Sequence, residues 1–140
     1  FQTVKKPLRG IMLTQDLLYQ ILDYAKGMYP KEIMLLARGD RIGSYLYIDE
    51  VLSPPFQHNG RDFASINVFY TPFTPSIIGT IHSHPSGALR PSLQDLLSYM
   101  GKIMGIAAYP FEGKKDLAFF DRKGNIIPYY IGTKESAKDS

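Results

Sequence analysis

The segment from Gly79 to Asp95 constrains the fold of this chain more than any other, because it predicts a strand, a tight loop and a helix in direct succession. It reads Gly-Thr-Ile-His-Ser-His-Pro-Ser-Gly-Ala-Leu-Arg-Pro-Ser-Leu-Gln-Asp. Side chains alternate across a strand, so His82 and His84 lie on one face while Ile81 and Ser83 point the other way. The proline and glycine that follow end the strand and turn the chain. Two imidazoles are therefore expected to converge at a strand end.

The helix after this loop is expected to run from Ser92 to Met104, with Asp95 in its first turn and a stripe of leucines along one face. Zinc hydrolase sites take three protein ligands from His and carboxylate side chains and keep a fourth position for water. His82, His84 and Asp95 fill that quota, so we expect one zinc ion per chain. Such a set leaves the ion with a formal charge of about +1, which brings the pKa of bound water from 15.7 towards about 7. A carboxylate that moves the proton is still required.

The same residues allow a purely structural interpretation. Ser92 and Asp95 are close to the capping-box pattern, in which the serine accepts a hydrogen bond from an early helix N–H and the aspartate only complements the helix dipole. A His-x-His pair on a strand is also a weak signal by itself. However, two of the three histidines of the chain stand here, at the point where an apolar strand meets a capped helix. A capping role and a catalytic role are compatible.

The rest of the chain predicts an α/β domain, a mixed β-sheet flanked by helices. Helical spacing of apolar residues predicts a helix from Thr14 to Gly27, and Glu32 stands at the start of a buried strand that ends at Arg38. Gly39-Asp40 is expected to turn into an antiparallel strand at 45–51. Further strands are expected at 63–70, 76–82, 106–109, 117–120 and 126–131. Residues 1–132 are interpreted as one domain and 133–140 as a frayed polar tail.

Composition excludes several classes of function. The 140 residues, 44% hydrophobic and 21% charged, are typical of one soluble globular domain. The absence of cysteine from the sequence excludes disulfides and a thiolate nucleophile. The net charge of +3 is spread along the chain, so no nucleic-acid partner is expected. With no apolar run near 18 residues and no signal-peptide pattern, we expect no membrane association and a cytoplasmic protein. His58 lies in turn chemistry and is expected to be a solvated loop residue.

At this point a resemblance to a known family emerges. His82-Ser-His84-Pro, a seven-residue spacer and Ser92-x-x-Asp95 resemble the motif H-x-H-x7-S-x2-D of the JAMM metalloproteases, the JAB/MPN domain family, at every defining position. The resemblance spans nearly the whole chain. It implies a cytidine-deaminase-like arrangement of a mixed sheet and helices.

A second segment around Glu32 is similar to the part of the family that carries a catalytic glutamate. It comprises Pro30-x-Glu32, then Leu35-Leu36 and Gly39. The chain departs from the family in having Ile33-Met34 where Cys-Gly is common. It also has no long insertion after the motif helix, which makes it similar to minimal archaeal or bacterial members.

The resemblance implies a zinc-dependent isopeptidase that hydrolyses the amide bond after the C-terminal glycine of ubiquitin or a ubiquitin-like modifier. It implies that His82, His84 and Asp95 bind zinc. It also implies that Glu32 deprotonates the zinc-bound water and protonates the leaving amine, while Ser92 donates a hydrogen bond to the oxyanion. Conjugates of ubiquitin-like proteins are thus the expected partners, and the sequence leaves monomer and homodimer both open.

Other function classes stay open beside this one. The Ser-Gly after Pro85 and the Pro-Ser before Asp95 are similar to the RadC-type branch, which admits a zinc hydrolase that trims a sulfur-carrier protein or a small peptide. A metal-free MPN scaffold is a second alternative, although scaffolds typically lose ligands that this chain keeps. A basic surface for DNA is a weaker one. The segment 56–70 is expected to form part of a groove in which an extended substrate tail adds to a sheet edge.

Overall fold

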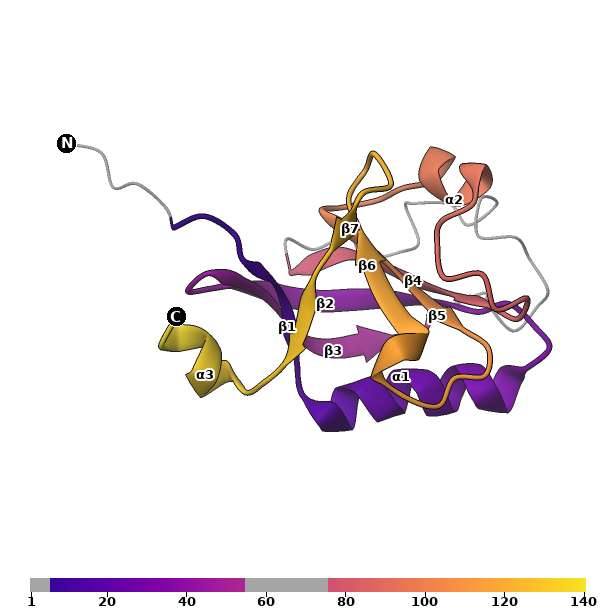
Figure 1. The fold of residues 1–140 in the computed structure, drawn as a ribbon, viewed down its shortest axis with the longest axis horizontal. Coiled ribbons are helices and arrows are strands. Elements are labelled where there is room, and N and C mark those ends of the chain that lie inside the picture. The colour runs from indigo at the N-terminus through magenta and orange to yellow at the C-terminus, as the bar shows by residue number, and fades with distance from the viewer. Residues whose placement is uncertain (1–5, 55–75) are drawn as a thin grey trace.

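The computed structural model describes residues 6–54 and 76–140, which form an eight-stranded mixed sheet with helices on both faces (Figure 1). Its elements are β1 Gly10–Leu13, α1 Gln15–Met28, β2 Met34–Ile42, β3 Tyr45–Leu52, β4 Ile77–His84, α2 Leu93–Leu97, β5 Ile103–Ala108, the short 3-10 helix η3 Lys114–Asp116, β6 Leu117–Phe120, β7 Ile126–Ile127, β8 Tyr129–Ile131 and α3 Lys134–Lys138. The α/β class predicted from the sequence is confirmed. The strand at 63–70, the loop around His58 and the groove at 56–70 lie outside the described residues.

The sheet has the strand order β7-β6-β5-β4-β2-β3-β1-β8. Its two edge strands, β7 and β8, are consecutive in the chain and only Pro128 separates them. The sheet must therefore curl until its edges come close together. β4 and β5 run parallel, so their carboxyl ends lie at the same end of the curled sheet, whereas β2 runs antiparallel to β4.

One face of the sheet packs against α1, which runs along the lower side of Figure 1. Thr14 caps this helix by accepting a hydrogen bond from the N–H of Leu17 at 3.2 Å, and the helix itself confirms the one predicted from the sequence. The residues of α1 that face the sheet are Leu17, Leu18, Ile21, Leu22 and Ala25, all buried. They contact inward-facing residues of the central strands, among them Ile81 and Phe119. Of the described helices, none is both long and apolar enough to cross a membrane.

The turn between β2 and β3 is not at Gly39-Asp40, where we expected it. β2 continues to Ile42, and the chain turns at Gly43 and Ser44. Gly39 instead sits at a register shift between the two strands. A Cβ at this position would lie 2.0 Å from the carbonyl oxygen of Tyr47, so the close approach of two backbones explains the glycine.

The helix expected from Ser92 to Met104 is much shorter, because α2 ends at Leu97. Its leucines Leu93 and Leu97 are 74% and 80% exposed, so the apolar stripe does not pack against the core. Gly101, with φ at +79°, redirects the chain into β5, which begins at Ile103 rather than at Ile106. The backbone must leave the helix early to bring β5 beside β4.

The C-terminal segment is also ordered, contrary to the expectation of a frayed tail. Residues 134–138 form α3, and Thr133 caps it by accepting from the N–H of Ser136 at 3.2 Å. Ala137 is fully buried beside β1 and β3. The strand expected over 126–131 is divided at Pro128, which cannot donate a ladder hydrogen bond.

Candidate active site

β4 presents His82 and His84 on the face of the sheet that is turned away from α1. Ile81 belongs to the core under α1, and Ser83 is only 1% exposed, so the alternation predicted from the sequence is found. In the antiparallel ladder, Met34 of β2 is the direct partner of His82. Both imidazoles thus stand at the carboxyl end of β4.

The orientation of His84 is fixed by two contacts. Its Nδ1 lies 2.7 Å from the carbonyl oxygen of Ala88, which can only accept, so this nitrogen carries the hydrogen. Its Nε2 lies 2.9 Å from Oδ2 of Asp95. In a neutral imidazole of this tautomer, Nε2 carries a lone pair and faces a carboxylate oxygen. Two acceptors at this distance require a cation between them, either a proton or a metal ion.

His82 approaches the same carboxylate from the other side. Its Nδ1 lies 3.9 Å from Oδ1 of Asp95, and its Nε2 is 3.1 Å from the hydroxyl oxygen of Thr80. Burial lowers the pKa of His82; Asp95 opposes this effect and His84 adds to it. The imidazole is therefore neutral at neutral pH, the form in which histidine binds a metal.

Asp95 has the capping role and faces the histidines at the same time. Its Oδ2 accepts the backbone N–H of Ser92 at 2.8 Å, and its own N–H donates to Oγ of Ser92 at 3.0 Å, which completes a capping box. Burial alone would raise the pKa of Asp95. Hydrogen bonds from Ser92 and the two nearby histidines outweigh it, and the pKa is lowered. The carboxylate is thus ionised.

Glu32 is exposed and immediately precedes the buried start of β2. The β2–β4 ladder ends at the pair Met34 and His82, so Glu32 lies two residues beyond the last paired residue of β2, at the end of the sheet where β4 carries His84. Ser83 holds the two segments together there. Its Oγ accepts the N–H of Ile33 at 2.7 Å, and its own N–H donates to the Ile33 carbonyl at 2.9 Å.

This role of Ser83 was not predicted from the sequence. The available signal was a serine in an apolar strand on the side opposite the histidines, where a buried hydroxyl needs a hydrogen-bond partner. Its partner, the start of β2, could not be identified without the strand register.

The three predicted ligands can be tested for fit to a metal. Within residues 6–54 and 76–140, no three His, Cys, Asp or Glu side chains stand as a ready metal cluster. Ligand atoms bound tetrahedrally to zinc at about 2.0–2.1 Å are roughly 3.3 Å apart. The Nε2 of His84 lies 2.9 Å from Oδ2 of Asp95, and Nδ1 of His82 lies 3.9 Å from the other oxygen, Oδ1. The two histidines thus stand beside one ionised carboxylate, and this set of donors fits zinc in its chemistry.

Comparisons with known proteins agree with this geometry. No protein-family model matches the chain. A probable metalloprotease from Haloferax volcanii is 31% identical over 127 residues, which cover 81% of this chain and 74% of that protein. A JAB1/MPN domain protein from Archaeoglobus fulgidus superposes with a TM-score of 0.65 and 26% identity over 88% of this chain and 100% of the other. A structure described as a JAMM metalloprotease-like zinc site in the proteasome and signalosome superposes with a TM-score of 0.62. It is 27% identical in sequence, and the match covers 88% of this chain and 98% of the other.

Proposed function

This chain belongs to the JAMM metalloprotease family of JAB1/MPN domain proteins, and from that premise we propose that it hydrolyses the amide bond after the C-terminal glycine of ubiquitin or a ubiquitin-like modifier. The observation that carries the proposal is the convergence of His82, His84 and Asp95 at the carboxyl end of β4. Glu32 precedes the start of β2 at the same end of the sheet. The substrate class rests on the resemblance of this motif to the family.

His82, His84 and Asp95 are the residues that would hold zinc, one ion per chain. A zinc ion held there would supply Lewis-acid chemistry, which polarises a carbonyl and lowers the pKa of a water molecule. The lowered pKa values of His82 and Asp95 keep both side chains free of the protons that would compete with a metal ion.

Glu32 is the proposed general base and acid. Its carboxylate takes a proton from the attacking water as the new C–O bond forms, and returns a proton to the leaving nitrogen as the C–N bond breaks. The products are a C-terminal glycine carboxylate and a free amine. Because Glu32 is exposed, we expect bound substrate to cover it and exclude bulk water.

Ser92 is the proposed oxyanion donor. Its Oγ accepts the N–H of Asp95 at 3.0 Å, which fixes the oxygen beside the carboxylate of a proposed zinc ligand. A pre-positioned donor of this kind stabilises the negative charge on the carbonyl oxygen in the transition state without reorganisation.

A substrate panel with Glu32→Gln tests the proposal. Zinc-loaded protein is incubated with ubiquitin and ubiquitin-like fusions that carry a peptide after the terminal glycine, and products are identified by mass spectrometry. Glu32→Gln should lose about 10²- to 10⁴-fold in turnover while it retains its zinc. Glu135→Gln, an exposed carboxylate on α3, is the matched control and should cleave like wild type.

The panel also separates the alternatives. A sulfur-carrier fusion and a short peptide amide represent the RadC-like hydrolase, and cleavage of these alone would replace the ubiquitin-like substrate class. Zinc-loaded wild type that cleaves nothing would favour a scaffold. Full turnover by Glu32→Gln would remove Glu32 from the mechanism.

A further inference from the structure

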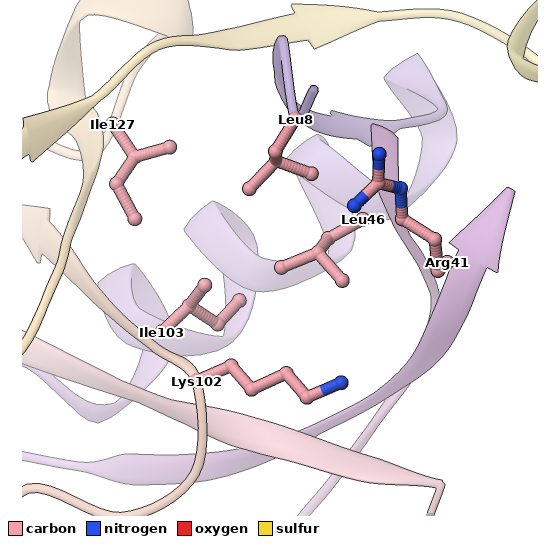
Figure 2. Close-up of a pocket in the computed structure, with 6 residues that line it drawn as sticks. All are labelled: Leu8, Arg41, Leu46, Lys102, Ile103 and Ile127. Carbon is pink, nitrogen blue, oxygen red and sulfur yellow. The ribbon is translucent and has the colours of Figure 1, made fainter. Parts of the chain in front are cut away.

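A pocket of about 200 Å³ opens at the end of the sheet opposite to the two histidines. Lys102, at its rim, donates its backbone N–H to Ile78 at the start of β4, whereas His84 ends that strand. Six residues of extended chain separate the two positions by about 20 Å. The pocket is lined by Leu8, Arg41, Leu46, Lys102, Ile103 and Ile127 (Figure 2). It is therefore distinct from the proposed active site.

The interior of this pocket is apolar. Leu46 and Ile103 are 5% and 0% exposed and belong to the main core under α1. Leu8, at 42% exposed, and Ile127 complete the wall, and Figure 2 shows these four side chains converging. The floor of the pocket is thus the edge of the hydrophobic core.

Two cations stand at the same side of this apolar surface. The Arg41 guanidinium is held in place by neutral groups: its Nε donates to the carbonyl of Gly43 at 2.9 Å, and another N–H donates to the carbonyl of Lys6. Asp40 accepts the backbone N–H of Arg41 at 2.8 Å. In the described part of the chain, neither Arg41 nor Lys102 forms an ion pair with a carboxylate. The rim therefore carries positive charge that no described side chain neutralises.

We propose that this pocket binds a small carboxylate with a short apolar tail. The guanidinium fork has further N–H donors beyond the two in use, and its planar geometry matches a carboxylate. Lys102 adds a second positive charge from its exposed position. An apolar cavity of about 150 Å³ holds benzene, so this pocket has room for roughly eight non-hydrogen atoms. Hexanoate, with a carboxylate and a five-carbon tail, has that size.

Titration with probes that share a tail or a head group tests the proposal. Backbone amide NMR spectra of the full chain are followed at constant ionic strength with acetate, butyrate, hexanoate, hexanol and hexylammonium. We expect hexanoate to shift the amides of Leu46 and Ile103, with affinity rising about fourfold for each added methylene group. Hexanol and hexylammonium should bind more weakly, because neither complements the cationic rim.

Variants at the rim complete the experiment. Lys102→Gln should weaken hexanoate binding about two- to fivefold, and Arg41→Gln about tenfold or more. Lys123→Gln removes an exposed lysine from a distant turn and should change nothing. The proposal is overturned if acetate or hexanol binds as tightly as hexanoate, or if both rim variants bind hexanoate like wild type. It is also overturned if no probe shifts these amides at 10 mM, which is about ten times the Kd expected of so small a ligand. Because the readout is binding, it does not depend on hydrolase activity.

Discussion

Asp95 has two roles that substitution can separate. Its Oδ2 accepts the Ser92 N–H at 2.8 Å as part of the helix cap, and the same carboxylate lies 2.9 Å from His84 as a candidate metal ligand. Asp95→Asn keeps an oxygen that can accept the capping hydrogen bond but removes the negative charge. Asp95→Ala removes both. The two variants therefore differ in the cap and agree in lacking a carboxylate.

The contribution of Asp95 to the helix cap is measured without metal. Loss of a cap costs about 1 kcal/mol, which for a domain of this size lowers the melting temperature by about 3–4 °C. In the presence of EDTA, calorimetry should place Asp95→Ala lower than wild type by that amount, with Asp95→Asn between them. Ser92→Ala removes the other half of the capping box and leaves the zinc ligands intact. Its melting temperature in EDTA should be close to that of Asp95→Ala.

The contribution of Asp95 to zinc binding is measured after zinc is supplied. At a free zinc concentration 100 times the dissociation constant, binding adds about 2.7 kcal/mol of stability, which is about 8–10 °C. Wild type and Ser92→Ala should show this increase and contain about one zinc per chain by elemental analysis. Neither Asp95 variant should. If zinc raises the melting temperature of Asp95→Ala as far as that of wild type, the ligand assignment is wrong.

Three further predictions concern the fold. Gly79→Ala should lower the free energy of unfolding in urea by about 1–3 kcal/mol, because its Cβ would lie 2.0 Å from the Ile103 carbonyl oxygen. Gly27→Ala meets nothing within 4 Å and should stabilise α1 by about 0.5–1 kcal/mol. Equal urea midpoints for the two variants would refute the packing argument. Burial raises the pKa of Tyr99 to about 12, so its neutral form is favoured by folding. Stability should hold below pH 10 and fall as pH rises from 10 to 12, less steeply in Tyr99→Phe, and identical calorimetric pH profiles would contradict this. Ala137→Glu places a charge at a fully buried site and should lower the free energy of unfolding in urea by at least about 2 kcal/mol; no change would mean that α3 does not pack.

The sequence predicted those features that depend on neighbouring residues. The capped helix α1 and the His82–His84 pair follow from local spacing, and the capping box of Ser92 and Asp95 spans only four residues. These patterns identified most residues of the candidate site, because four of its five members, His82, His84, Ser92 and Asp95, lie within one strand, loop and helix.

The features that were not predicted depend on partners that are distant in sequence. β1 was not predicted at all, since four apolar residues become a strand here only through pairing with β3 and β8. Gly39 looked like a turn glycine, but its role is to admit the backbone of Tyr47. Likewise, the placement of Glu32 at the end of the sheet that carries His84 requires the register of β2 on β4, which no local pattern contains.

The pairing of β1 with β8 has a consequence during protein synthesis. Ile11, near the start of the domain, pairs with Tyr129, near its end. A chain that leaves the ribosome N-terminal end first can join β1 to β3, but the other side of β1 stays unpaired until β8 has emerged. Exposed strand edges are templates for aggregation. Nascent or prematurely terminated chains that lack β8 should therefore be preferred targets for chaperones and proteases, even when every residue of the candidate active site has already been translated.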